Sequence, residues 1–477
     1  MDDMPSQSSP LNQDLIQSLK DLLGEKGWTD DQEIISPHTS DWRGNFVGHS
    51  DFMVSPSTTE EVSEVMKLCH RYGQPVCPQG GNTGLVNGGI AYGEIVLSMA
   101  RMNNVRSIDT FNNSLVAEAG CILANVHTAA DEQDRYFPLS LGSQGSCTIG
   151  GLISTNAGGV AVLRYGMMRD LLLGMEVVTA NGEIWSALRG LRKDNTGYDL
   201  KHLFCGAEGT LGIVTAATLK LFPKPKTATA WLTLETPQKA VELLSLVRKH
   251  AGDSVTGFEI LPKVGVELAA REIDAVRDPL PNEAPWRILL EVSLASEDHA
   301  QDVLQTVLEK ALEDSLITDG VVAASLSQAE MFWHVRESLP LVKRGFLTSV
   351  NHDISVPVSK VPQFLETTEA AMKEMVPDVE IFAFGHLGDG NIHYGVAERT
   401  DAENPTVKAK SLDITFKVHQ IVTDLGGSIS AEHGVGLLKR DELPDHKSET
   451  ELNMMRSIKK ALDPENLMNP GRVISVR

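Results

Sequence analysis

Two histidines, His386 and His393, stand in GHLGDGNIHYG, residues 385–395, on either side of an aspartate between two glycines. Neutral imidazoles are common ligands of divalent metals, so this pattern could hold an ion. It also fits a phosphate cradle, or a tight turn whose two histidines bind nothing. A distant segment, SAEHGVG, adds Glu432 and His433. Two histidines and one carboxylate with open positions for substrate are typical of catalytic Zn²⁺ or Mn²⁺, so we predict a metal site at His386, His393 and Glu432.

The elements around this motif should bring the two imidazoles together. Gly388 and Gly390 argue against a helix through the motif, because glycine is a poor helix former. VEIFAFGH before it and NIHYGVA after it both have the composition of strands. LGDG would then turn between the two strands of a hairpin, which can place both imidazoles at one end of a sheet.

Two glycine-rich loops in the first half suit an anion. CPQGGNTGLVNGG, residues 77–89, and LGSQGSCTIGGLISTNAGG, residues 141–159, combine adjacent glycines with serine, threonine and asparagine. Backbone N–H groups can converge on an anion where no Cβ intervenes, and the polar side chains add neutral donors. Two such loops suit a pyrophosphate held between them; the alternative is that both are simple turns. The chain has no GxxxxGK[ST], and its nearest GxGxxG look-alike lacks the last glycine and a preceding strand, which argues against P-loop and Rossmann sites.

The composition is that of a globular protein with an acidic surface. The 477 residues carry a formal net charge of −22, which disfavours nucleic acids and anionic membranes as partners. Five cysteines without a CxxC pair argue against a disulfide scaffold and fit a reducing compartment. The N-terminal MDDMPSQSSPLNQDL has the features of neither a signal peptide nor a transit peptide. No run approaches the ~18 apolar residues of a membrane span, so we expect a cytoplasmic protein.

Helix and strand patterns alternate along the chain without internal repeats. Residues 13–27 have leucines at helical spacing, and TTEEVSEVMKLCHRYGQ has a threonine cap, acids in its first turn and a terminal Gly73. Two prolines in FPKPKTATA, residues 222–230, indicate a domain boundary near 226. The segments after it predict a sheet with helices on one face. The tail, ETELNMMRSIKKALDPENLMNPGRV, predicts a helix stopped by proline.

Several motifs occur together and in order along the chain. They are PQGGNTGLVNGG, GSCTIGGLISTNAGG, DNTGYDLKHLFCGAEGTLGIVT, HLGDGNIH, EHGVG and NPGRV. With these motifs the chain, over residues 35–477, resembles the FAD-linked D-2-hydroxy-acid dehydrogenases. The resemblance is closest to the branch that acts on D-2-hydroxyglutarate and D-lactate.

The resemblance implies an α+β fold. A two-subdomain FAD-binding domain of the vanillyl-alcohol oxidase or PCMH type would be joined to an α+β substrate (cap) domain with an antiparallel sheet, and to a C-terminal helical segment. We expect an N-terminal helical segment over 1–46 and the FAD-binding domain over 47–226. The substrate domain with the metal site would span 227–430, and a segment over 431–477 would return to the flavin.

The resemblance also implies which residues bind FAD. Glu208, Gly209 and Ile213 would lie beside the adenosine, and Asn469 would approach the isoalloxazine. Residues of the first glycine loop would wrap the pyrophosphate, and those of the second would line the same cofactor. These loop residues are Pro78, Gly80, Gly81, Asn82, Thr83, Gly84, Gly142, Ser143, Thr148, Gly151, Asn156 and Gly158. Because QGGNTG contains no histidine where covalently flavinylated relatives have one, we expect non-covalent FAD.

Oxidation of a 2-hydroxy acid removes the hydroxyl proton and transfers a hydride from C2 to flavin N5. A neutral histidine suits the base, and His433 beside a metal ligand is our candidate; alternatively, it only hydrogen-bonds near the metal. A guanidinium suits the substrate carboxylate. The resemblance assigns this role to Arg336 in AEMFWHVRESLP; the alternative is a surface ion pair. Asn351 and His433 complete the predicted substrate-binding set.

D-2-hydroxyglutarate is narrowly favoured as the substrate. Pro340, Asn351 and Gly395 replace polar or charged residues of hydroxyglutarate-specific relatives. The alternatives are D-lactate, D-malate or another D-2-hydroxy acid, a glycolate-oxidase-like subunit, and an alkylglycerone-phosphate-synthase-like enzyme without net oxidation. As partners we expect an electron acceptor, such as an electron-transfer flavoprotein or a quinone, and a second copy of the chain in a homodimer.

Overall fold

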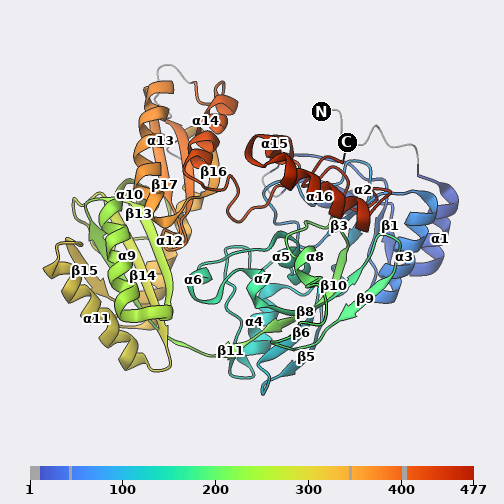
Figure 1. Cartoon of the computed structure of the whole chain (residues 1–477), viewed down its shortest axis with the longest axis horizontal. Coiled ribbons are helices and arrows are strands. Elements are labelled where there is room, and N and C mark those ends of the chain that lie inside the picture. Colours follow the sequence, from blue (N-terminus) through green and yellow to red (C-terminus); the bar gives the residue numbers. More distant parts are fainter. Residues whose placement is uncertain (1–10, 42–43, 45, 343–345, 400–405, 477) are drawn as a thin grey trace. The chain divides into compact units, whose positions relative to one another are not determined.

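The computed structural model describes residues 11–41, 44, 46–342, 346–399 and 406–476, without the side chains of 346, 347 and 399. The chain divides into two compact units (Figure 1). The first comprises Met1–Gly159, Gly166–Lys224 and Glu432–Arg477, and the second Val160–Tyr165 and Pro225–Ala431. The short excursion of 160–165 into the second unit was not foreseen in the sequence. The chain returns to the first unit between Ala431 and Glu432, inside the SAEHGVG segment.

The first glycine loop of the first unit follows strand β3 of a small four-stranded sheet. The sheet has the order β1-β2-β4-β3, in which β4 is parallel to both β2 and β3. The strands are β1 Trp28–Thr29, β2 Met53–Val54, β3 Val76–Gln79 and β4 Ile95–Ser98. Because β3 ends at Gln79, the loop begins at the carboxyl end of the parallel strands, where ligands of such sheets usually bind.

Helix α3, Thr59–Tyr72, connects β2 to β3 as the sequence predicts. The Thr58 side chain accepts a hydrogen bond from the Glu61 N–H, and Gly73 ends the helix at φ 62°. Helix α1 spans only Gln13–Leu23. The expected end at residue 27 was wrong, because Gly24 at φ 62° already leaves the helical conformation.

The second sheet of the first unit has five antiparallel strands in the order β5-β6-β10-β8-β9. They are β5 Val105–Asp109, β6 Ser114–Glu118, β8 Leu172–Val178, β9 Ile184–Ala187 and β10 Ile213–Lys220. Shorter elements accompany them: α2 Gln32–Ile35, α4 Leu123–Asp131, β7 Arg135–Tyr136, α5 Ile149–Thr155, α7 Met168–Leu171, α8 Lys201–Phe204 and β11 Phe222–Pro223. The second glycine loop leads into α5, and α5 lies against β6 and β10.

The C-terminal segment returns to β3 within the first unit. It contains α15, Leu443–His446, and α16, Glu449–Leu462, which a capping box of Ser448 and Glu451 begins. After α16, the Val76 N–H donates to Leu467 O, and the Asn469 N–H donates to Val76 O, both at 2.9 Å. The tail therefore lies beside the strand that leads into the first glycine loop.

The larger sheet of the second unit is antiparallel, as predicted, with the order β13-β14-β12-β15. Its strands are β12 Lys226–Leu234, β13 Val255–Pro262, β14 Trp286–Leu294 and β15 Asp319–Val322. The helices around it are α9 Pro237–Ala251, α10 Lys263–Glu272, α11 Glu297–Glu313 and α12 Leu326–Ser338.

Helices cover both faces of this sheet, so the prediction of helices on one face was wrong. Leu232 and Leu290 pack in the core that contains residues of α9 and α11. Their neighbours Trp231 and Leu289 pack in a separate core with α10 and α12. Both faces of the strands are therefore buried, which explains the nearly continuous apolar run RILLEVSL in β14.

A second sheet of this unit contains the predicted hairpin. Its order is β16-β18-β17, all antiparallel, with β16 Phe346–Ser355, β17 Val379–Phe384 and β18 Asn391–Arg399. Tyr394 of β18 packs in the core with α13, Val361–Met375, and α14, Ser411–Asp424. His393 follows the strand alternation to the opposite face. The remaining helix of the unit is α6, Val162–Tyr165.

All five cysteines are buried and unbridged, and burial protects their thiols. Burial raises the pKa of Cys69 and Cys77 to about 12 and that of Cys121 and Cys205 to about 11, and it also raises the pKa of Cys147. A raised pKa leaves little reactive thiolate at neutral pH, and its fraction grows as pH rises.

We therefore expect the native protein to react with Ellman's reagent slowly, at less than about one thiol per chain within minutes at about pH 8. The same protein in guanidinium should expose all five cysteines. Rapid modification of two or more thiols in the native protein would contradict this burial.

Candidate functional site

His386 and His393 lie together in the second unit, as the sequence predicts. His386 follows β17 directly after Gly385, and His393 lies on β18 opposite Phe384. The two imidazole centroids are 5.7 Å apart, with the rings nearly perpendicular. Two imidazoles at this separation could contribute to one metal site.

Glycines allow the turn that carries His386. Gly390, at φ 85°, donates its N–H to His386 O at 3.1 Å, and a Cβ on it would lie 2.0 Å from Val356 O. A Cβ on Gly388 would lie 2.4 Å from Leu163. Only glycine fits both positions without displacement of neighbouring atoms. This explains why LGDG has glycine at both positions.

A buried carboxylate, Glu259 of β13, holds His386 and Arg336. Its Oε1 is 2.6 Å from His386 Nδ1, and its Oε2 accepts from Arg336 Nε at 2.7 Å. Glu259 is only 1% exposed. Burial by itself would raise the pKa of this carboxyl, but the charges and hydrogen bonds of His386 and Arg336 lower it to about 2. Glu259 is therefore an ionised acceptor, and His386 Nδ1 must carry the shared proton.

The sequence predictions missed Glu259. Its only signal was a single acid inside the apolar strand TGFEILP, where an unpaired charge would be costly. The same contact corrects the alternative for Arg336. This residue of α12 is 7% exposed and pairs with a strand 77 positions away, so it does not form a surface ion pair. Its Nη2 also lies 3.4 Å from His386 Nε2.

A second buried acid, Asp353, lies opposite His393. The two residues are register partners in β16 and β18, and Asp353 Oδ1 is 3.7 Å from His393 Nδ1. Asn391 donates to the same oxygen at 2.8 Å and to Ile354 O at 2.9 Å. Each histidine of the motif therefore has a buried carboxylate on its Nδ1 side, a common way to orient metal-binding imidazoles.

Asn351 and Gly395 form another register pair of the same two strands. They lie two positions from Asp353 and His393, so they belong to the same face. Asn351 is exposed and donates to Ser349 Oγ at 3.0 Å, and a Cβ on Gly395 would lie 3.1 Å from Asn351 Oδ1. Asn351 and Gly395 are themselves both uncharged. Pro340 lies in a short 3₁₀ turn, Leu339–Leu341, after α12.

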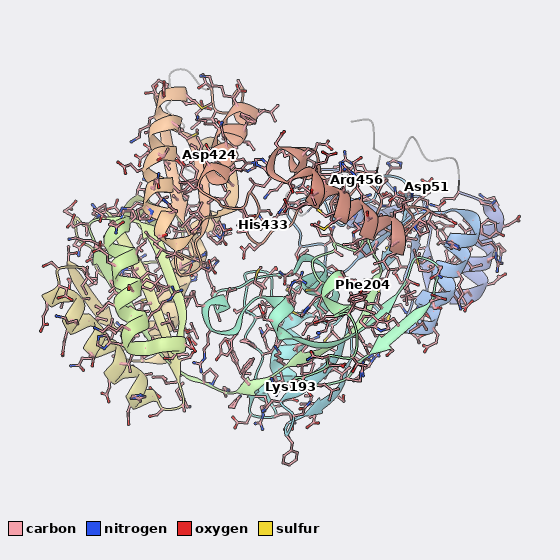
Figure 2. All side chains as sticks on the ribbon, in the orientation of Figure 1. Asp51, Lys193, Phe204, Asp424, His433 and Arg456 are labelled. Carbon is pink, nitrogen blue, oxygen red and sulfur yellow. The ribbon has the colours of Figure 1, made fainter. Side chains whose placement is uncertain are left out.

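Glu432 and His433 belong to the first unit, at the start of its third segment. His433 Nε2 is 4.0 Å from Glu432 Oε1, and His433 is labelled in Figure 2. The preceding residue, Ala431, belongs to the second unit and donates its N–H to Asp353 O at 3.3 Å. Glu432 directly follows Ala431 in the chain, and Ala431 is hydrogen-bonded to the strand that pairs with His393. Its role as the third ligand stays a prediction.

The two glycine loops pack directly against each other in the first unit. A Cβ on Gly80 would lie 2.2 Å from Thr148 Oγ1, and one on Gly81 would lie 2.0 Å from Ser146 O. By contrast, nothing lies within 4 Å of a Cβ built on Gly84 or Gly142. The loops thus touch through glycines and leave open space beside them, which suits a cradle for a large anion.

The chemistry of this cradle fits FAD. Among the residues that the structure describes, Thr148 Oγ1 and Asn469 Oδ1 are buried without a hydrogen-bond partner. Asn469 Nδ2 donates at 2.8 Å to both Gly88 O and Glu208 O, which orients its free oxygen. Such orphaned polar atoms usually belong to a site for water or a ligand.

Not every predicted FAD contact has a free side chain. Asn156 Oδ1 accepts from Arg169 N at 2.9 Å, and Asn82 Nδ2 donates to Ser40 O at 3.0 Å. Glu208 binds backbone N–H groups of 435 and 436. The predicted FAD-binding roles of these three residues stay predictions, as do those of Pro78, Gly80, Gly81, Thr83, Gly84, Gly142, Ser143, Thr148, Gly151, Gly158, Gly209, Ile213 and Asn469. A Cβ on Gly209, at φ 73°, would lie 2.8 Å from Pro78 Cγ.

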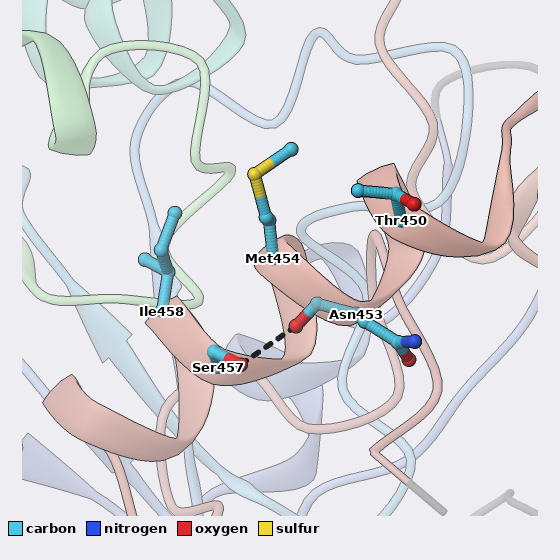
Figure 3. A pocket seen from close by; sticks show the side chains of 5 residues that line it. All are labelled: Thr450, Asn453, Met454, Ser457 and Ile458. Atoms are coloured by element: carbon cyan, nitrogen blue, oxygen red, sulfur yellow. Dashed lines mark hydrogen bonds between the residues drawn. The ribbon is translucent and has the colours of Figure 1, made fainter.

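A surface hollow on α16 is a different feature. It is lined by Thr450, Asn453, Met454, Ser457 and Ile458 (Figure 3). None of these side chains is titratable or a usual metal ligand. The hollow therefore offers none of the chemistry found at the two histidines or the glycine loops.

Comparison with known proteins identifies the family. Residues 224–473 match "FAD linked oxidases, C-terminal domain", and residues 50–187 match "FAD binding domain". The chain belongs to the FAD-linked oxidases. This FAD-linked oxidoreductase is similar to a probable mitochondrial D-2-hydroxyglutarate dehydrogenase of Oryza sativa subsp. indica, at 37% identity over 98% of the chain and 82% of the relative. A D-2-hydroxyglutarate dehydrogenase of Stutzerimonas stutzeri is 35% identical over 97% of the chain and 99% of its own length.

The fold prediction is confirmed as well. The solved structure of p-cresol methylhydroxylase with substrate bound matches with a TM-score of 0.75 over 98% of both chains, at 18% identity. At this identity the match concerns the fold alone. Within the described part of this oxidoreductase, we find no helix with the length and apolar character of a membrane span.

Replacement of Glu259 by glutamine tests the buried charge. Glu259→Gln leaves Arg336 buried without its counter-charge, and we expect the free energy of unfolding to fall by about 3–5 kcal/mol. Urea denaturation followed by tryptophan fluorescence measures the loss. Glu366→Gln, at an exposed position of α13, is the control and should change stability by less than about 0.5 kcal/mol. Equal stability of the two variants would contradict the proposed burial of an ionised Glu259.

Proposed function

We propose that this FAD-linked oxidoreductase is a divalent-metal-dependent dehydrogenase of D-2-hydroxy acids, with D-2-hydroxyglutarate narrowly favoured. One observation supports it most: Glu259 holds a guanidinium and an imidazole side by side, with Arg336 Nη2 3.4 Å from His386 Nε2. A 2-hydroxy acid presents a carboxylate and a hydroxyl on adjacent carbons. A cation for the carboxylate beside a metal ligand for the hydroxyl matches that pair of groups.

Arg336 binds the substrate carboxylate in this proposal. Glu259 accepts its Nε–H and fixes the plane of the guanidinium beside His386, where the guanidinium meets the substrate carboxylate. His386, His393 and Glu432 hold the metal, Zn²⁺ or Mn²⁺. The bound metal supplies Lewis acidity, which lowers the pKa of the substrate hydroxyl.

His433 accepts the hydroxyl proton, and Asn351 contacts the far end of the substrate. Oxidation breaks the O–H and C2–H bonds and forms the C=O bond of the 2-oxo acid; the proton goes to His433 and the hydride leaves with its electron pair. FAD, held non-covalently between the glycine loops, supplies the hydride acceptor. The orphaned atoms of Thr148 and Asn469 support these loops as its site.

Two kinds of substrate side chain are candidates, one with a distal carboxylate and one without. The names of the curated relatives favour D-2-hydroxyglutarate. The neutral pair Asn351–Gly395 favours an acid without a distal carboxylate, such as D-lactate. D-malate, a shorter dicarboxylate than D-2-hydroxyglutarate, lies between these two cases. An electron-transfer flavoprotein or a quinone as final acceptor, a homodimer and a cytoplasmic location complete the proposal.

The first test uses the flavin colour. Purified holoprotein should be yellow, and its absorbance near about 450 nm should bleach anaerobically with a D-2-hydroxy acid but not with the L-enantiomer. A panel of D-2-hydroxyglutarate, D-malate and D-lactate with one dye acceptor ranks the substrates by kcat/KM. Absence of bleaching by every D-2-hydroxy acid in flavin-replete protein would reject the proposed activity.

The second test concerns the metal. Chelation should abolish bleaching, and Zn²⁺ or Mn²⁺ should restore it. His386→Ala should lower kcat/KM by more than about 100-fold, because it removes a ligand rather than a neighbour of one. His250→Ala, at an exposed position of α9, is the control. Full activity of His386→Ala after chelation would refute the metal assignment.

A further inference from the structure

Glu208 of the first unit has an unusual conformation for an acidic residue. It lies between Gly206 and Gly209 with φ 50°, in the left-handed region that side chains with a Cβ rarely adopt. It is nevertheless 8% exposed, so its charge has lost most of its contact with water. A strained backbone and a buried carboxylate are both costly, and such positions cluster at functional sites.

Every polar group of Glu208 bonds to a different segment of the first unit. Its N–H donates to Ser154 O of α5 at 2.7 Å, and its carbonyl accepts from Asn469 Nδ2 at 2.8 Å. Its two carboxylate oxygens accept from the N–H groups of Val435 and Gly436, each at 2.8 Å. One residue thus joins the second glycine loop, the C-terminal tail and the 434–436 segment.

The neighbours of the carboxylate are glycines. A Cβ on Gly434, at φ 83°, would lie 2.7 Å from Glu208 Oε1, and one on Gly88 would lie 3.3 Å from Oε2. The Gly436 position is also closed, because a Cβ there would lie 1.9 Å from Val86 O. These close approaches let the carboxylate reach backbone N–H groups that a bulkier residue would cover.

The protonation state of the Glu208 carboxyl agrees with its two bonds to backbone N–H groups. Burial raises the pKa of the Glu208 carboxyl to about 6, although the N–H groups of Val435 and Gly436 and the charge of Lys439 lower it. Near neutral pH the carboxylate is therefore ionised and accepts both bonds. Charge-assisted bonds of this kind are stronger than neutral ones.

We infer that Glu208 is a positioning residue for the 432–436 segment, which it fixes relative to the glycine loops. The inference rests on the proposed function, in which Glu432 binds the metal and His433 accepts the proton. Only Gly434 separates His433 from the residues that Glu208 holds, so the backbone of Glu432 and His433 is restricted once Val435 and Gly436 are bound. This role differs from the contact with adenosine that the sequence resemblance implied.

The test is amide hydrogen exchange of FAD-loaded holoprotein. In Glu208→Gln, one acceptor becomes an NH₂ group that faces an N–H, so we expect peptides that cover 434–436 to exchange at least about 10-fold faster than in the wild type. The matched control is Glu176→Gln. Glu176 is equally buried at 8% exposure, but it bonds to Thr59, Arg106, Ser186 and Thr215 of other segments. This control should leave the 434–436 peptides within about two-fold of the wild type.

Kinetics adds a second measurement. Glu208→Gln should lower kcat about 10- to 100-fold with little change in KM and with full flavin content, because Arg336 and the FAD cradle remain in place. Gly434→Ala perturbs the same contact from the other side and should give the same pattern if Glu208→Gln folds poorly. Unchanged exchange at 434–436 in a folded Glu208→Gln variant would overturn the inference, as would equal acceleration in Glu176→Gln.

The two proposals fail separately. If the wild-type protein oxidises no 2-hydroxy acid, the proposed function fails, while the exchange experiment still decides whether Glu208 holds the segment. If the wild type is active but Glu208→Gln keeps its kcat despite faster exchange, only the positioning role fails.

Discussion

A carboxylate that is buried away from water needs cations or hydrogen-bond donors of the protein around it. Glu259 creates this need inside the second unit. Its partners, Arg336 and His386, come from a helix and from a turn, and both are fixed by the same charge. Isolated buried charges are unstable, so each partner supports the others. The consequence is chemical: with the Nδ1 proton of His386 committed to Glu259, the nitrogen that can bind a metal is Nε2.

The same principle operates in the first unit through Glu208. The Glu208 carboxylate accepts hydrogen bonds from the backbone N–H groups of 435 and 436, whereas Glu259 pairs with cationic side chains. The difference suits the two tasks. Glu259 orients the two side chains that we propose to meet ligands, whereas we infer that Glu208 fixes the course of a chain segment. In both cases the acid itself stays buried and, in our proposal, acts through other residues.

Backbone geometry in the first unit is unusual where the cofactor is expected. Asn82, Asn156, Glu208 and Asn469 all have positive φ although they carry a Cβ. Asparagine tolerates this region better than most residues, since its short amide can bond locally. Together with Gly80 and Gly81, which lie close against Thr148 and Ser146, these residues fix the course of the loops. A rigid cradle binds its ligand at a smaller cost in conformational entropy.

Much of the fold could be predicted from the sequence, because its signals are local. Helix α3 was visible from its cap and terminal glycine, and the β17–β18 hairpin from strand composition on either side of LGDG. Some local signals were misread: Gly24 ends α1 early, and the apolar run of β14 marks a sheet buried on both faces. The first error is local, because a glycine commonly ends a helix. The second arose because tertiary packing decides how many faces of a sheet are buried.

The family, the glycine loops and the pair His386 and His393 can be recognised from the sequence alone, since each is encoded by neighbouring residues. Only the tertiary structure revealed Glu259 and Glu208. Glu259 lies 127 positions from His386, and Glu208 lies 228 positions from Gly436. No periodicity or spacing links residues so far apart. They meet because the fold brings them together in the interior, where the cost of an unpaired charge makes the contact obligatory.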